Sequence, residues 1–263
     1  MSDNPLLQKL KLPGRVFQLP SRGMFYNNGE LDESVKDGEI HVHPMSALAE
    51  INMKNPDQLF SGQAVEAVFK DCVTGVLKPS QLLSKDVDAI MIFLRTATYG
   101  GAYEFSAKHT CADAKEHTYT ADVDTWIAGS KLVDPTVINE QFTVKLPNDQ
   151  VVRLRPARYE SIIEILKSNQ GKTEFTVEDH KRNLIHMLKS VIAQVDDVTD
   201  KEMIGQWIES PRLQSKWVSL IAEKIAELNN GWGIEPSWTA QCRDCGEEFT
   251  VHLPINPVDF FTE

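Results

Sequence analysis

The sharpest local motif of the sequence is Cys242-Arg243-Asp244-Cys245-Gly246. Two cysteines separated by two residues and followed by glycine let the backbone turn tightly enough for both sulfurs to face one metal ion. The flanking segments, 237–241 and 248–253, have the composition of strands, as a ribbon knuckle requires. Tetrahedral zinc needs four ligands and this motif supplies two, so the other ligands must come from elsewhere in the chain.

A second segment with the same strand–turn–strand layout surrounds Cys111. Cys111 stands where Cys242 stands in the carboxyl-terminal hairpin. Ala114 takes the place of the second cysteine, and His117 follows three residues later. The two hairpins together therefore predict a split, zinc-ribbon-like site.

The simplest complete ligand set is Cys111, His117, Cys242 and Cys245, which would bind Zn²⁺. His109 is the rival fourth ligand, and its position before Cys111, in alternating strand geometry, makes it the weaker choice. A site closed by four protein ligands has no open position, so it would stabilise structure and perform no catalysis. It would also join residue 111 to residue 242 across the intervening helices, which favours one integrated domain.

Three other interpretations of the cysteines stay open. A redox-active pair normally opens a helix in a thioredoxin-like unit, whereas this pair lies between strands. A disulfide conflicts with the reducing compartment that four cysteines in a chain of 263 residues without a secretory signal indicate. Pairing by chance is the third interpretation.

Composition argues against two kinds of partner. The formal net charge is −11 and there is no long Lys/Arg run, so phosphate backbones would be repelled and nucleic-acid binding is not expected. No stretch of about 18 apolar residues occurs, so no membrane span is expected. The sequence also has no nucleophile elbow, phosphate-binding glycine loop, His-Glu-x-x-His pattern or calcium loop, and we expect no enzymatic activity.

The remaining pattern predicts an α+β fold, mainly helical, with β-hairpins and an extended amino-terminal arm. Residues 1–60 are rich in Pro, Gly and Asn and are expected to form the arm with short strands, one of them around Glu39–His43. Residues 61–263 are expected to form a single domain. Its predicted parts are helices over 61–100, hairpins over 103–155, helices over 156–230 and the knuckle hairpin over 234–263.

The arm is predicted to serve a partner more than the protein's own core. It has few periodic apolar positions and would bury little surface to offset the entropy of ordering it. Its apolar residues are clustered, which suggests a docking segment: Val16, Phe17, Leu19, Met24, Phe25 and Tyr26.

Taken together, the sequence resembles the baseplate-hub and baseplate-assembly proteins of T4-like contractile-tailed bacteriophages. The resemblance rests on the cysteine hairpins and on three short motifs. These are Leu19–Gly23 with Phe25-Tyr26, Glu39–Val42 followed by Pro44-Met45, and Ser61-Gly62 opening a helix that ends near Cys72-Val73. Relatives can carry a fuller pair of CxxC knuckles, from which this chain departs at Ala114.

The resemblance implies a structural or assembly role in the hub region of a tail baseplate, through protein–protein contacts. Implied partners are other baseplate and tail proteins, reached through the arm, with an oligomer possible within the assembly. The implied location is the virion and, during assembly, the host cytoplasm. The alternative is a zinc-ribbon adaptor that binds a protein or a nucleic acid. A basic ribbon would support that role, but this one carries Asp244, Glu247 and Glu248.

Overall fold

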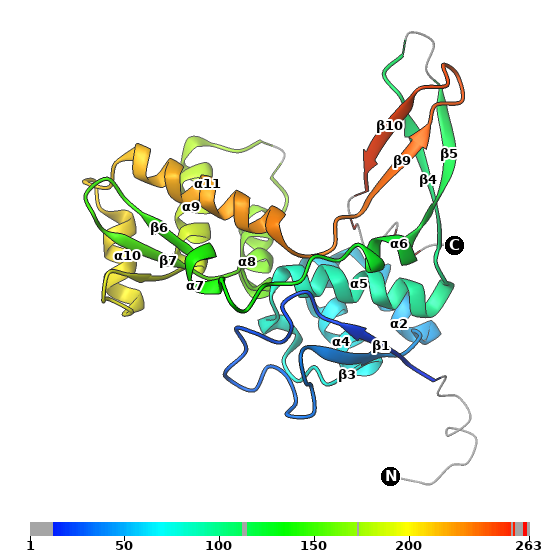
Figure 1. The fold of residues 1–263 in the computed structure, drawn as a ribbon, viewed down its shortest axis with the longest axis horizontal. Helices are drawn as coiled ribbons and strands as arrows, with labels where there is room; N and C mark the ends of the chain where they lie inside the picture. The colour runs from blue at the N-terminus through cyan, green and yellow to red at the C-terminus, as the bar shows by residue number, and fades with distance from the viewer. Residues whose placement is uncertain (1–12, 112–114, 173, 254, 256–259, 262–263) are drawn as a thin grey trace.

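The computed structural model describes residues 13–111, 115–172, 174–253, 255 and 260–261, and Figure 1 shows their arrangement. The fold is α+β, as predicted, with several small antiparallel sheets among the helices. Two bodies of helices lie side by side, and a pair of β-hairpins projects away from them (Figure 1).

The first core is built around a long buried helix. Its elements are β1 (Arg15–Gln18), β2 (Glu39–Val42), α2 (Ala47–Met53), α3 (Pro56–Phe60), α4 (Gln63–Cys72), β3 (Val73–Thr74), η1 (Pro79–Gln81), α5 (Ser84–Tyr99) and α6 (Val123–Ala128). The side chains of residues 89–94 in α5 are all buried, so this helix packs on every side. It ends at Gly100, whose φ of 83° suits a glycine, as the sequence predicts.

The segment predicted to be an arm contributes to this first core. Phe17 and Leu19 are buried, and the Phe17 ring stacks on Phe93 with the ring centroids 4.4 Å apart. β1, β2 and β3 form an antiparallel sheet in that order, so strand pairing with residues beyond 60 orders the segment. The expectation of an extended arm is therefore corrected for residues 13–60. The rest of the predicted arm, residues 1–12, lies outside the described residues.

The second core comes from the middle of the chain. Its elements are α7 (Ile138–Gln141), β6 (Thr143–Lys145), β7 (Val151–Leu154), α8 (Tyr159–Asn169), α9 (Val177–Val191), β8 (Ile192–Val195), α10 (Lys201–Glu209) and α11 (Ser215–Gly231). The three strands form one antiparallel sheet in the order β6-β7-β8. Ile221 and Leu228 of α11 are buried in this core, so one face of this helix packs inward.

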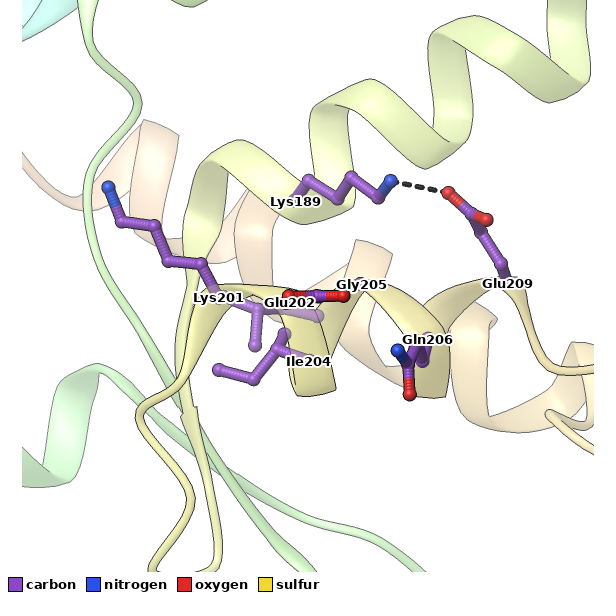
Figure 2. Close-up of a pocket in the computed structure, with 8 residues that line it drawn as sticks. Lys189, Lys201, Glu202, Ile204, Gly205, Gln206 and Glu209 are labelled. Atoms are coloured by element: carbon purple, nitrogen blue, oxygen red, sulfur yellow. Dashed lines mark hydrogen bonds and ion pairs between the residues drawn. The ribbon is translucent and has the colours of Figure 1, made fainter.

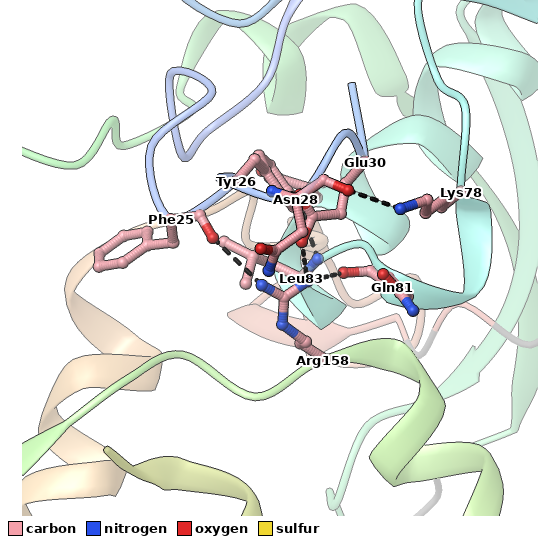
Figure 3. Close-up of polar contacts among 9 residues, drawn as sticks. Phe25, Tyr26, Asn28, Glu30, Lys78, Gln81, Leu83 and Arg158 are labelled. Carbon is pink, nitrogen blue, oxygen red and sulfur yellow. Dashed lines mark hydrogen bonds and ion pairs between the residues drawn. The ribbon is translucent and has the colours of Figure 1, made fainter. Parts of the chain in front are cut away.

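A polar cluster links the two cores, and Figure 3 shows it. The Arg158 guanidinium, at the start of α8, donates to Glu30 Oε1 at 2.9 Å, to the Gln81 carbonyl at 2.5 Å and to the Phe25 carbonyl at 3.2 Å. The Glu30 side chain is only 1% exposed, so this buried carboxylate depends on its charged partner. Residues 25–30 therefore tie the second core to the first.

Candidate metal centre

Two hairpins form the projection in Figure 1. One consists of β4 (Ala102–Lys108) and β5 (Glu116–Asp122), and the other of β9 (Ser237–Gln241) and β10 (Glu248–His252). Each is a separate two-stranded antiparallel sheet. The end of β4, the start of β5 and the turn between β9 and β10 lie at the far end of the projection, which brings segments distant in sequence together (Figure 1).

Aromatic side chains fill the space between the hairpins. Along β4 and β5 exposed and less exposed residues alternate, as strand geometry requires, and Phe105 and Tyr119 point inward. The Tyr119 and Phe249 rings meet edge to face with centroids 5.8 Å apart, which joins the first hairpin to the second. This packing brings the two turns close enough for their side chains to meet.

The turn of the second hairpin has the geometry expected of a knuckle. The Gly246 amide donates to the Cys242 carbonyl at 2.9 Å, and the Cys242 amide donates to the Glu247 carbonyl at 2.8 Å. Gly246 has a φ of +79°, a conformation that favours glycine. Tight closure by these two hydrogen bonds keeps the Cys242 and Cys245 side chains on the same turn.

Four side chains from the two turns converge. The potential ligand atoms of His109, Cys111, Cys242 and Cys245 all lie within 4.8 Å of one another. Cys111 Sγ is 3.9 Å from Cys242 Sγ, and Cys245 Sγ is 3.4 Å from His109 Nδ1. A tetrahedron with Zn–S bonds of about 2.3 Å places two sulfurs about 3.8 Å apart. The spacing of this donor set therefore fits a tetrahedral ion.

The thiols experience different surroundings. The pKa of Cys242 is lowered to about 7, mainly because the backbone amide of Cys245 donates to its sulfur. The pKa of Cys111 is raised to about 11, first by desolvation and then by the neighbouring Cys245 and Cys242 thiols. Thiolate is the form that binds a metal, and a cation at the centre of the group would favour the thiolate at each position.

His117 has a different partner from the one that the sequence predicts. Its Nε2 lies 2.9 Å from Asp244 Oδ2, and the same oxygen accepts from the Lys115 amide at 2.9 Å. These bonds hold the pKa of Asp244 below its usual value, the Lys115 amide contributing most. The described group of four contains His109 in place of His117.

The reason lies in where the strand ends. The sequence argument against His109 assumes strand alternation up to Cys111, but β4 ends at Lys108. His109 is thus in the turn, where alternation no longer sets the direction of its side chain. His117 lies within β5, paired with Ala107, on the inward face that meets the second knuckle. Sequence reasoning also missed Asp244, for which the only signal is its place inside the CxxC motif.

A groove elsewhere in the described part of the chain is lined by no thiol or imidazole. A groove of about 420 Å³ between α9 and α10 is drawn in Figure 2. Lys189 and Glu209 form an ion pair at its rim, and Lys201 and Glu202 add one further charge of each sign. The balanced, exposed charges give this groove no preference for an anion or a cation.

The fold and the cysteine-rich tip define an α+β protein whose two hairpins can share one structural metal ion. Within the described residues, no helix is long and apolar enough to cross a membrane. The family described as the T4 bacteriophage base plate protein matches residues 39–262, and the chain belongs to this family. No match was found among curated proteins or among solved structures. The family confirms the resemblance that the sequence motifs indicate and supports a structural role in a phage baseplate, among other baseplate components.

Proposed function

We propose that the chain is a non-enzymatic structural or assembly component of the hub region of a contractile-tail phage baseplate, with a zinc-stabilised double hairpin. The observation that carries this proposal is the convergence of four ligand atoms from two hairpins whose cysteines, Cys111 and Cys242, are 131 residues apart. Membership of the baseplate family supports the place of action.

The donor set favours zinc over other common ions. Three thiolates and one imidazole are soft or intermediate ligands, which suit Zn²⁺ and do not suit Mg²⁺ or Ca²⁺. His109 is our choice for the fourth ligand, because its Nδ1 is already 3.4 Å from Cys245 Sγ. His117 is the alternative, and binding there would require it to leave Asp244. Four protein ligands complete the coordination, so the ion stabilises the tip and activates no water.

The proposed mode of action is protein–protein contact within the virion baseplate, with assembly taking place in the host cytoplasm. The base of the double hairpin packs on the first core and its far end projects beyond both cores, so the surfaces of the far end can be reached by neighbouring subunits (Figure 1). The acidic residues at the second knuckle, Asp244, Glu247 and Glu248, favour protein over nucleic acid as the partner.

Complementation of a phage that cannot make this chain tests the role. The double substitution Cys242→Ser/Cys245→Ser should leave the helical cores folded but reduce incorporation into particles, as measured by quantitative mass spectrometry. Cys72→Ala is the matched control, because Cys72 is a buried thiol of α4 in the first core and should not affect the metal. Full incorporation of the double variant would disprove a role for the tip. Absence of the wild-type chain from both mature particles and baseplate intermediates would disprove the baseplate role.

A further inference from the structure

The outer edge of β4 is a second feature of the projecting hairpins. Among the described residues, β4 has one strand neighbour, β5, in a two-stranded sheet. An edge strand presents backbone donors and acceptors that another extended chain can pair with. The composition of β4, with neither proline nor glycine, leaves this edge able to accept a strand.

The hydrogen-bond register identifies which groups face outward. The Val123 amide donates to the Gly101 carbonyl at 2.7 Å, and the pairing continues through Tyr103↔Ala121 and Phe105↔Tyr119. Because hydrogen-bonded and non-hydrogen-bonded pairs alternate in antiparallel sheets, the backbone groups of the intervening residues point away from β5. Glu104 and Ser106 are the central ones. The Ala102 carbonyl agrees with this register, since it accepts from Arg95 outside the sheet at 3.1 Å.

A cavity of about 410 Å³ lies along the same edge. It is lined by β4 residues between Ala102 and Ser106, by Thr118 of β5 and by Arg95 and Tyr99 of α5. A paired strand would lie about 4.8 Å from β4, so an added chain would run beside the part of this cavity that Arg95 and Tyr99 line. The helix end closes one side of the cavity, and this would limit how far an incoming segment can extend.

Charge indicates the kind of segment that fits. The exposed face of the β4–β5 hairpin carries three carboxylates and one lysine: Glu104, Glu116, Asp122 and Lys108. The Arg95 guanidinium already donates to the Phe260 and Ala102 carbonyls and lies over the Tyr103 ring. Glu104 is therefore the exposed charge at the centre of the edge, and a cationic side chain opposite it would be favoured.

We propose that the β4 edge binds an extended, basic segment of another baseplate protein by strand addition. The segment would pair with Glu104 and Ser106 and would place Lys or Arg opposite Glu104. Main-chain hydrogen bonds supply the binding and the side chains supply the selectivity, as in other cases of strand addition. The inference rests on the proposed baseplate role.

Amide hydrogen exchange gives a direct readout of strand addition. The probe is the set of tail intermediates purified from cells infected with a phage that cannot make this chain, mixed with the full-length protein. The outward amides of Glu104 and Ser106 should exchange at least tenfold more slowly in the complex than in the free chain. The Thr120 amide, on the opposite edge of the hairpin, should be unchanged. Unchanged exchange at Glu104 and Ser106 in a complex that does form would overturn the proposal.

Proline substitution tests the same edge by loss of binding. Ser106→Pro removes an outward amide, so it spares the ladder with β5, and it should weaken binding to the intermediates at least tenfold. Thr120→Pro makes the matched change on the far edge and should bind as the wild type does. Zinc content and circular dichroism are measured for both variants. Wild-type binding by folded Ser106→Pro, or equal weakening by Thr120→Pro, would overturn strand addition at β4.

A charge substitution covers the case in which Ser106→Pro does not fold. Glu104→Lys should weaken binding at low ionic strength at least tenfold, whereas Glu223→Lys, at an exposed position of α11 in the second core, should not. Equal effects of the two would overturn the assignment of the edge. If the wild-type chain binds no intermediate at all, the proposed baseplate role itself fails. If it binds and the β4 variants bind equally well, only the present inference fails.

Discussion

The imidazole of His117 and the carboxylate of Asp244 meet across the two hairpins, with Nε2 and Oδ2 2.9 Å apart. Their side chains are 23% and 20% exposed, so water only partly screens the contact. The pair joins β5 to the second knuckle beside the four potential metal ligands. The two hairpins are thus connected twice, once by the ligand group and once by this polar contact.

Substitution of each histidine should separate these two connections. His109→Ala should abolish stoichiometric zinc binding, because three ligands would remain for an ion that needs four. His117→Ala should keep one zinc per chain but loosen the hairpins, with a loss of about 1 kcal/mol for the contact with Asp244. Elemental analysis and thermal unfolding of the two purified variants check this. Loss of zinc in His117→Ala alone would instead identify His117 as the ligand.

Removal of the metal should destabilise the projection more than the cores. Structural zinc contributes free energy of folding directly, so chelation should lower the unfolding temperature of the wild-type protein. The second core has a buried cluster of its own, and the cluster of the first core includes many buried residues of α4 and α5 besides those of the hairpins, so the helical circular dichroism should persist after chelation. The metal site would be contradicted if protein purified without chelator contained no zinc and its unfolding temperature did not change when a chelator was added.

Asp86 should make stability depend on pH. Its side chain is fully buried and accepts hydrogen bonds from the Ser21 amide and the Tyr26 hydroxyl, at 3.0 and 2.6 Å. Burial raises its pKa from 3.8 to about 6. The folded state therefore binds this proton more tightly than the unfolded chain does, and the contribution of Asp86 to stability falls as pH rises from about 4 to about 6.

Asp86→Asn isolates that contribution from those of other carboxyl groups. The difference in unfolding free energy, variant minus wild type, should become more positive by up to about 3 kcal/mol between pH 4 and pH 7, since one pKa unit corresponds to about 1.4 kcal/mol. Urea unfolding at several pH values measures it. A difference that does not change with pH would show that Asp86 titrates normally.

Arg158 should stabilise the contact between the two cores. Arg158→Ala would leave the carboxylate of Glu30 buried without its charged partner, which should destabilise the protein by about 3 kcal/mol. Arg158→Ala/Glu30→Gln removes the charge as well and should recover part of that loss. Denaturant unfolding of both variants provides the measurement. Equal stability of Arg158→Ala and the wild type would indicate that water replaces the guanidinium.

Local signals in the sequence predicted much of the fold. The helix that ends at Gly100, the helices within 156–230 and both cysteine hairpins depend on periodicity and turn chemistry within short windows. The family match confirms what the combined motifs indicate. The convergence of Cys111, Cys242 and Cys245 agrees with the similar layout of the two hairpins, whereas metal binding by them stays a prediction.

Long-range pairing accounts for what the sequence did not predict. The sequence around Phe17 and Leu19 has no helical periodicity, so it does not predict that these residues belong to a core. They are buried because β1 pairs with β2 and β2 pairs with β3. The direction of the His109 side chain depends on the end of β4 at Lys108, the residue just before it. Neither the partner of a strand nor the last residue of a hairpin strand is determined by its immediate neighbours.

The separation of Cys111 and Cys242 by 131 residues also has a consequence during synthesis. At ribosomal speeds of about 5–20 residues per second, the first turn is made on the order of 10 s before the second. During that interval His109 and Cys111 are an incomplete pair of ligands, and the nascent chain cannot close the centre around an ion. All four side chains could therefore bind one ion only after the whole second core has been translated, and a metal-filled centre would mark a chain in which the two hairpins have paired.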